Sequence, residues 1–188
     1  MSTMIIGLIL FLGIHLLPTV PRVRLAAVGR LGANRYKGLF ALASAAGLVL
    51  IVVGYAHSDA HDRIFAPVPA AIGIAPYALT VSFILLAAAN MRGHLRHILQ
   101  HPMLIGILIW SFVHLLANGD RTGTVLFGAF FAYAVVDLLS AIRRRAVKAF
   151  EPEAKFDLIA VAAGIVVALA VMTFHRLLFG KAVVAFGI

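Results

Sequence analysis

The sequence predicts an all-α integral membrane protein, a six-transmembrane-helix bundle with short loops that forms one domain over residues 1–188. Of its residues, 63% are hydrophobic and 12% are charged, whereas in a typical soluble domain about half are apolar and a quarter charged. The apolar residues also gather in long runs. In hydrocarbon such a run must pair its own backbone groups, which favours helices, and no segment has the short alternating pattern of a β-barrel strand.

Six apolar segments reach or approach the roughly 17–25 residues that cross a bilayer as a helix. They are Met4–Val20, Gly38–Ala56, Gly73–Met91, Pro102–Asn118, Gly123–Ile142 and Phe156–His175. The first has no charged segment before it and no small-residue cleavage pattern, so we expect a retained span rather than a signal peptide. The tail LLFGKAVVAFGI (177–188) is too short to cross, and we expect it at the interface or against the bundle.

The basic residues predict the orientation of the spans. Of the 16 Lys and Arg residues, twelve fall in the loops after spans one, three and five, and the others are Arg63, Arg121, Arg176 and Lys181. Because cationic loops stay in the cytoplasm, both termini should lie on the opposite side. The net charge of +9 is then explained by topology and anionic lipid rather than by a nucleic-acid partner. The absence of cysteine excludes disulfides and thiolate metal sites.

A polar stripe lies inside the fourth span. Ser111, His114 and Asn118 are three and four residues apart, so they share one helix face, with Trp110 beside them. Neutral imidazole is a good ligand for iron, copper or zinc, and two histidines from different helices can hold a haem iron from both faces. The alternative is a histidine whose hydrogen bond links neighbouring helices.

Two other ionisable residues lie in the spans, where such residues are functional candidates by default. His15 is near the inner end of the first span, and Asp137 is in the inner half of the fifth. We expect Asp137 to pair with an arginine of the inner loops rather than to carry protons. Small residues that favour helix contacts are Gly7, Gly13, Gly47, Gly54, Gly123 and Gly128.

His101 marks the cytoplasmic end of the fourth span, because Pro102 suits the first turn of a helix. It lies thirteen residues before His114, which corresponds to about 20 Å along a helix, so the two cannot ligate one metal. Two weaker metal hypotheses need other groupings: His94, His97 and His101 on a continuous helix, or His57 and His61 beside Asp59 and Asp62. The outer loop Ala56–Ile72 is a connector, or else a lid or partner surface.

Four segments resemble the NnrU family of bacterial membrane proteins when they are taken in order. They are LGIHLLPTVPRVR, RLGANRYKGLFALASAAGLVLIVVGY, RGHLRHILQHPMLIGILIWSFVHLLANGD and LFGAFFAYAVVDLLSAIRRR, and the match extends to about Arg145. The resemblance implies a protein of the bacterial inner membrane, and the distribution of Lys and Arg then predicts that both termini are periplasmic. It also implies a link to denitrification, with nitrogen-oxide respiratory enzymes as expected partners.

The NnrU family is related to the 15-cis-ζ-carotene isomerases, membrane enzymes that hold haem b between two histidines. One of their ligands lies in a short first-span motif, which His15 resembles. The other lies thirteen residues after the histidine of an Arg-His-Pro motif, as His114 does after His101. Two positions differ: Ser111 stands where the isomerases have a cysteine, and Gln100 stands where the motif has arginine.

The resemblance therefore implies haem b with His15 and His114 as ligands, and we expect Trp110, Ser111 and Asn118 around it. The predicted role is an accessory or redox factor that supports nitrite and nitric oxide reduction. The alternatives are a haem-dependent cis-trans isomerase of a carotenoid or other polyene, and a cofactor-free transporter or structural subunit. When residues are counted from the ends of the spans, His15 and His114 differ in membrane depth by about 10 Å. Both ligands of one iron must lie at nearly the same depth, so His101 is left open as a replacement for one of them.

Overall fold

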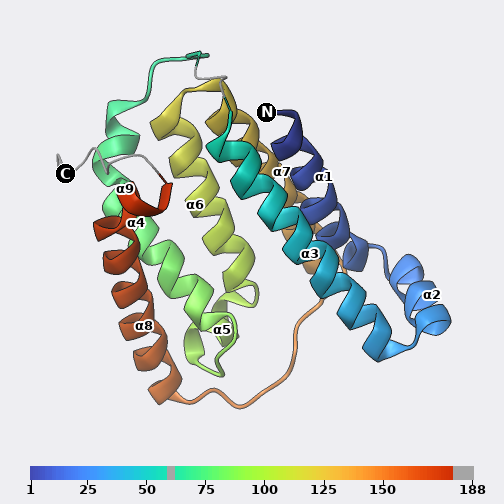
Figure 1. Cartoon of the computed structure of the whole chain (residues 1–188). Helices are drawn as coiled ribbons and strands as arrows, with labels where there is room; N and C mark the ends of the chain where they lie inside the picture. The colour runs from blue at the N-terminus through green and yellow to red at the C-terminus, as the bar shows by residue number, and fades with distance from the viewer. Residues whose placement is uncertain (59–61, 180–188) are drawn as a thin grey trace. The chain divides into compact units, whose positions relative to one another are not determined.

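The structure, a computed structural model, describes residues 1–58 and 62–179. Within these ranges the regular structure is helical (Figure 1). The elements are α1 (Ser2–Leu16), the short 3₁₀ turn η1 (Leu17–Thr19), α2 (Pro21–Leu31), α3 (Ala33–Ala56), α4 (Pro69–Ala88), α5 (His94–Leu99), α6 (Pro102–Asn118), α7 (Arg121–Arg143), α8 (Ala154–Thr173) and α9 (His175–Phe179). They form two compact units, Met1–Asp62 and Arg63–Ile188, which are described one at a time. The prediction of a single domain stays a prediction.

Five helical segments in the described residues are long and apolar enough to cross a membrane. They are Ser2–Thr19, α3, α4, α7 and α8. The sixth predicted span is α6, which has the predicted bounds Pro102–Asn118 but is only 17 residues long. The protein is therefore an all-helical membrane protein with five candidate spans by length and composition, together with one shorter apolar helix.

Two short helices, α2 and α5, lie where the sequence predicted only loops. Proline at the start of α2 presets the helical backbone, and Gly32, with φ of 78°, ends it. The span predicted to begin at Gly38 also begins earlier, at Ala33. Arg35 and Lys37 had been counted as loop residues, although long cationic side chains can extend from a helix end to the interface. Of the predicted interfacial tail, residues 180–188 lie outside the described residues.

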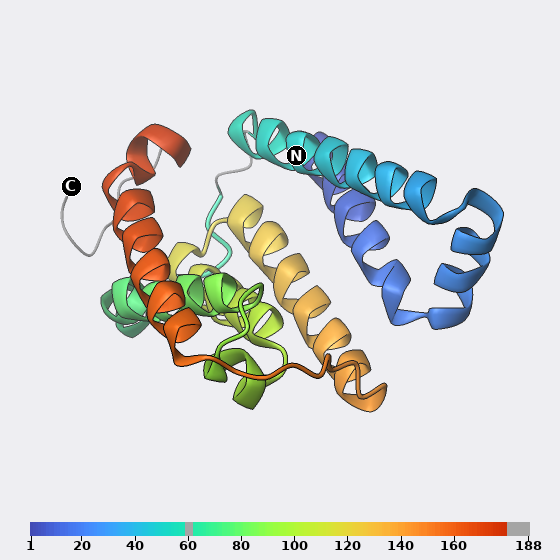
Figure 2. The same cartoon turned by 90° about the horizontal axis from the view of Figure 1, so that it is seen from below.

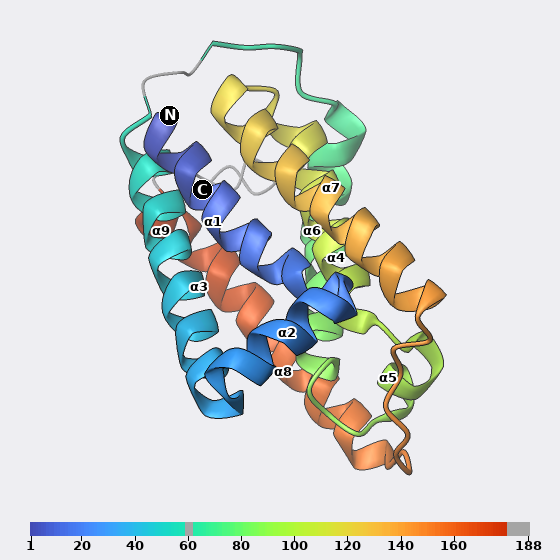
Figure 3. The ribbon, with the colours of Figure 1, turned by 90° about the vertical axis from the view of Figure 1, so that its right-hand side faces the viewer.

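Unit 1 is built on close contact between α1 and α3, which lie side by side in Figure 3. A Cβ atom on Gly7 would come within 2.6 Å of the backbone nitrogen of Ile51, and one on Gly47 within 2.8 Å of that of Phe11. A Cβ on Gly54 would collide with the Met4 backbone. These three predicted contacts are confirmed. Gly13 was predicted to belong with them, but within its own unit nothing lies near its Cβ position.

Unit 2 places α4 between α6 and α8, and α7 packs against α6 (Figures 1 and 2). The Ser82 hydroxyl of α4 donates a hydrogen bond to the Gly106 carbonyl of α6 at 2.8 Å. Gly164 of α8 lies against the backbone of Ile84. On α8 the buried residues are small, namely Ala160, Gly164 and Ala168, whereas the large apolar side chain of Leu158 is 72% exposed. This arrangement suits lipid, where apolar side chains need no burial in protein.

Backbone hydrogen bonds hold the turn between α6 and α7. Gly119 ends α6 with φ of 71°, and the Asp120 carboxylate caps α7 by accepting from the Gly123 amide at 2.7 Å. That cap explains the place of Gly123, which was predicted at a helix contact. The Gly119 carbonyl accepts from the Ile64 amide at 2.8 Å, and the Leu116 carbonyl accepts from the Val68 amide at 3.0 Å. The outer loop from Arg63 to Val68 is therefore attached to this turn.

At the opposite end of unit 2, α5 depends on one carboxylate from α8. Asp157 accepts hydrogen bonds from the backbone amides of His94 at 2.8 Å and Leu95 at 2.9 Å. It also contacts Nδ1 of His94 at 2.9 Å. Gly93 makes room for this carboxylate, because a Cβ there would collide with it. A six-residue helix is too short to be stable alone, so α5 relies on this distant cap.

We expect Gly47→Ala and Gly54→Ala to lower the stability of the folded protein by about 1–3 kcal/mol, because each forces α1 away from α3. Gly13→Ala is the matched control on α1. It adds the same methyl group into space that its unit leaves open, and should leave stability unchanged or slightly raised. Thermal unfolding in detergent, followed by circular dichroism, measures this difference. Equal effects at all three positions would contradict the packing described above.

Asp157→Ala should speed hydrogen exchange of the α5 backbone amides by about two- to thirtyfold, the range expected for loss of a helix cap. Glu153→Gln, at the same end of α8, is the control because no hydrogen bond joins its carboxylate to an α5 amide in the described structure. Peptide-level mass spectrometry of the exchange covers residues 93–100. Unchanged exchange in Asp157→Ala would show that α5 does not need this cap.

Candidate functional site

His114 lies in the fourth turn of α6, with its imidazole bonded to its own helix. Nδ1 lies 2.9 Å from the Trp110 carbonyl, one turn earlier. A carbonyl can only accept, so the ring donates from Nδ1, and in the neutral tautomer the lone pair is then on Nε2. If His114 holds a metal, Nε2 is the ligand atom.

Aromatic rings from α6 and α7 surround the His114 imidazole. Phe127 stacks on it at 4.7 Å between ring centroids, with an angle of 28° between the planes. Trp110 lies 5.3 Å away and itself meets Phe127 at 5.1 Å and Phe130 at 5.4 Å, both edge to face. Phe127 and Phe130 were not predicted as part of the site. Their spacing of three residues on one helix face was the available signal.

The other two members of the predicted polar stripe use their polar groups on α6 itself. Ser111 is fully buried, and its hydroxyl donates to the carbonyls of Ile107 at 2.6 Å and Leu108 at 3.2 Å. The Asn118 side-chain amide donates to the His114 carbonyl at 2.7 Å. The structure thus brings Trp110 against the imidazole and Asn118 against the backbone of His114. The predicted roles of Ser111 and Asn118 near a cofactor stay predictions.

His15, in unit 1, repeats the local arrangement of His114. Its Nδ1 lies 2.7 Å from the Phe11 carbonyl, again one turn earlier on the same helix. Its ring lies 4.3 Å from that of Phe11 and 5.1 Å from that of Phe40 on α3. Each predicted ligand is therefore a half-buried imidazole that is oriented by a backbone carbonyl and flanked by aromatic rings.

His57 provides a comparison, because its Nδ1 also bonds the carbonyl one turn earlier, Val53, at 2.9 Å. It is exposed at the end of α3. The backbone bond alone therefore does not identify a metal ligand. His15 and His114 differ from His57 because they combine this bond with partial burial and aromatic neighbours. The proposed partners of His57 in a weak metal site, Asp59 and His61, lie outside the described residues.

The histidines at positions 94, 97 and 101 do not lie on one continuous helix. Helix α5 ends at Leu99, and Gln100 turns the chain with φ of 60° before α6 begins. His94 bonds Asp157, and His97 meets the Phe150 ring at 5.9 Å. The alternative of an aligned zinc or copper site is therefore wrong in its geometry. No group of three or more metal-ligating side chains occurs among the described residues.

Asp137 pairs within α7 and its C-terminal end, as predicted. One carboxylate oxygen lies 3.9 Å from an Arg144 guanidinium nitrogen, and the other accepts from the Tyr133 hydroxyl at 3.1 Å. The structural pairing of this residue is confirmed.

The chain was also compared with known proteins. The search of curated proteins and the search of solved structures each found no match. A family model described as NnrU protein matches residues 3–183, which is nearly the whole chain. The chain therefore belongs to the NnrU family.

Proposed function

We propose that this protein binds haem b through His15 and His114 in the inner membrane of a bacterium. There it supports nitrite and nitric oxide reduction as an accessory or redox factor. Membership of the NnrU family fits a membrane protein linked to denitrification. The haem and the specific role are our own inference.

The observation that carries the proposal is the shared orientation of the two imidazoles. Each commits Nδ1 to a backbone carbonyl, at 2.7 Å in His15 and 2.9 Å in His114. Metal-ligating histidines in general donate their other ring N–H to such an acceptor, which fixes the tautomer and makes the ligating nitrogen more basic. The donor chemistry of both residues therefore fits a haem iron.

The surroundings of both histidines also suit haem. Phe11 and Phe40 flank one imidazole, and Trp110 and Phe127 flank the other, so each site offers flat apolar surface to a porphyrin. A haem b held by two histidines supplies one-electron redox chemistry, and burial and hydrogen bonding tune its potential. In this chain the backbone carbonyls of Phe11 and Trp110 would hold the ligand rings in place.

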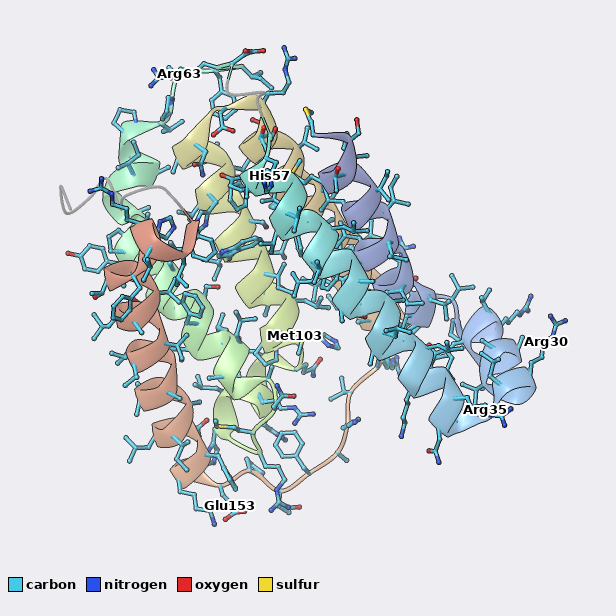
Figure 4. The ribbon with its side chains drawn as sticks, in the orientation of Figure 1. Arg30, Arg35, His57, Arg63, Met103 and Glu153 are labelled. Carbon is cyan, nitrogen blue, oxygen red and sulfur yellow. The ribbon has the colours of Figure 1, made fainter. Side chains whose placement is uncertain are left out.

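The distribution of charge supports a topology of six spans with periplasmic termini. In unit 1, Arg30 and Arg35 lie at one end of α3 and His57 lies at the other (Figure 4). In unit 2, Glu153 marks the cation-rich end of the helices, and Arg63 marks the opposite end (Figure 4). A cation-rich end favours the cytoplasm. When α6 is counted as a span, successive loops alternate between the cytoplasmic and the periplasmic side along the chain.

His15→Ala and His114→Ala should each lower the haem-to-protein ratio by more than about tenfold, since even indirect supports of a metal ligand change affinity by 10–100-fold. Any haem that remains should lose the sharp, split visible bands of a six-coordinate reduced iron. His57→Ala and His101→Ala are the controls and should keep the wild-type spectrum. Absorption spectra of purified protein, oxidised and reduced, after expression with added haem measure both effects.

A colourless wild-type preparation from haem-supplied cells would overturn the haem proposal. A spectrum altered by His101→Ala and left unchanged by His114→Ala would instead overturn the ligand assignment. Turnover of a carotenoid by haem-loaded protein would favour the isomerase activity over the accessory role.

Reporter fusions test the topology separately from the haem. Alkaline phosphatase, which is active only in the periplasm, should be active when fused at the C-terminus or after Asn118. It should be inactive when fused after Gly32 or Gln100. Activity after Gln100 together with inactivity after Asn118 would reverse the orientation, and equal activity at both points would show that α6 does not cross.

A further inference from the structure

A cavity of about 200 Å³ opens at the cation-rich end of unit 2. The connection between α5 and α6, the start of α6 and the segment that follows α7 form its walls. Figure 2 shows that segment passing beneath α5 on its way to α8, and Figure 4 labels Met103 on the α6 wall. Its polar lining includes Arg96, His101 and Lys148, and its apolar lining includes Met103, Leu104 and Phe150.

The cavity is positively charged because no acidic residue is among those that line it in the described structure. Two acidic residues follow the lining residue Phe150 in the sequence. Glu151 is exposed and is not part of the lining. Glu153 is engaged elsewhere, because it bonds Lys155 at 2.6 Å and pairs with Arg92 at 3.6 Å. The hydrogen bond from Lys155 lowers the pKa of Glu153, so this carboxylate stays ionised beside those two cations.

Arg96 is held in place but keeps most of its hydrogen-bonding capacity. Its guanidinium lies 5.1 Å from the centre of the Phe150 ring, a cation–π contact that holds the group against this ring. One of its nitrogens makes a long hydrogen bond of 3.5 Å to the Met91 carbonyl. A guanidinium carries five N–H donors, so donors remain for an anion.

The imidazole of His101 contributes a buried nitrogen that has no partner. Nε2 is enclosed by protein and makes no hydrogen bond in the described structure. Buried polar atoms are almost always bonded, and an exception in a native protein calls for a ligand, water or ion. When Nε2 carries a proton, an anion oxygen that accepts its hydrogen bond would satisfy this atom.

The backbone beside His101 is strained. Gln100 has φ of 60° and ψ of −44°, and the His101 amide bonds the Leu99 carbonyl at 2.6 Å, which makes a tight turn of a kind that is rare outside functional sites. Arg145 is the other non-glycine residue with positive φ in the described chain. Its conformation is explained as the end of α7, where the Ala146 amide bonds the Ala141 carbonyl at 3.0 Å. Gln100 also ends a helix, α5, but its ψ of −44° is not that of a left-handed helix cap.

We propose that this cavity binds a phosphate-type anion, with Arg96, His101 and Lys148 as the hydrogen-bond donors. The volume is below the roughly 300–1,000 Å³ of pockets for larger ligands. It equals the space of about six or seven water molecules at roughly 30 Å³ each, which suits a single head group. Basic pockets between membrane helices at their cytoplasmic ends bind lipid head groups, and Met103 and Leu104 give the site an apolar edge. The same chemistry fits a phospholipid head group and free phosphate.

The test uses full-length protein stripped of lipid in a phosphate-free sugar detergent. The probes are inorganic phosphate, short-chain phosphatidylglycerol and short-chain phosphatidylcholine, whose phosphate charge is cancelled by choline. Native mass spectrometry counts the bound molecules, and the thermal midpoint gives the affinity. We expect one saturable site for the anionic probe. Arg96→Gln, Lys148→Gln and His101→Phe should each weaken it by about tenfold, the effect of one charge-assisted hydrogen bond.

Arg143→Gln is the matched control, since it removes the same charge at the end of α7 from a residue outside the lining, and it should bind like wild type. Arg96→Lys should restore part of the affinity. Binding of phosphatidylglycerol alone identifies a lipid site, and binding of inorganic phosphate identifies a site for the free anion. Three outcomes would overturn the proposal. Arg143→Gln could weaken binding as much as the lining variants do, phosphatidylcholine could bind as well as the anionic probe, or no probe could bind to wild-type protein. Circular dichroism checks that each variant is folded.

Discussion

Close approach of helix backbones at small residues is the contact on which both units depend. Lipid tails are as apolar as leucine, so apolar helices gain little from burying side chains against each other, and association depends on packing and hydrogen bonds. Gly54 against the Met4 backbone and Gly164 against the Ile84 backbone are contacts of this kind. Many large apolar side chains are exposed, and Leu158 and Leu177 are examples at 72% and 82%. A helix pair fixed in this way also fixes the side chains that its other faces carry.

The absence of water in the hydrocarbon explains how the polar side chains of the spans are used. Ser44, Thr80 and Ser111 each donate to the carbonyl one turn earlier on the same helix, and this bond uses the only proton that a hydroxyl has. His15 and His114 make the same kind of bond from Nδ1, but an imidazole has a second nitrogen with different chemistry. The same kind of bond therefore leaves Nε2 of each histidine as the nitrogen that could bind a metal in the proposed site.

The sequence predicted those features that depend on neighbouring residues. The bounds of α6 were predicted correctly because Pro102 begins the helix and Gly119 ends it, and both signals are local in the sequence. The spans were predicted from composition. Features that depend on distant partners were missed. The start of α5 is capped by Asp157, 63 residues away, and no local signal separates Gly7, which meets Ile51, from Gly13, which meets nothing in its unit. His15 and His114 were selected by their place in the spans and by the family resemblance. The contacts of Phe127 with His114 and of Phe130 with Trp110 depend instead on how α7 packs.

The length of α6 gives its two histidines different environments. With 17 residues the helix is about 26 Å long at 1.5 Å per residue, shorter than the hydrocarbon core of about 30 Å. Such a helix draws its polar ends toward the bilayer or thins the lipid beside it. In the proposed topology His101 then lies at the depth of the lipid head groups, where a strained turn and nearby cations are close to phosphate. His114 lies about 20 Å farther along the helix, between the rings of Trp110 and Phe127. The same residue type on one helix can therefore serve an anion at one end and a metal within the span.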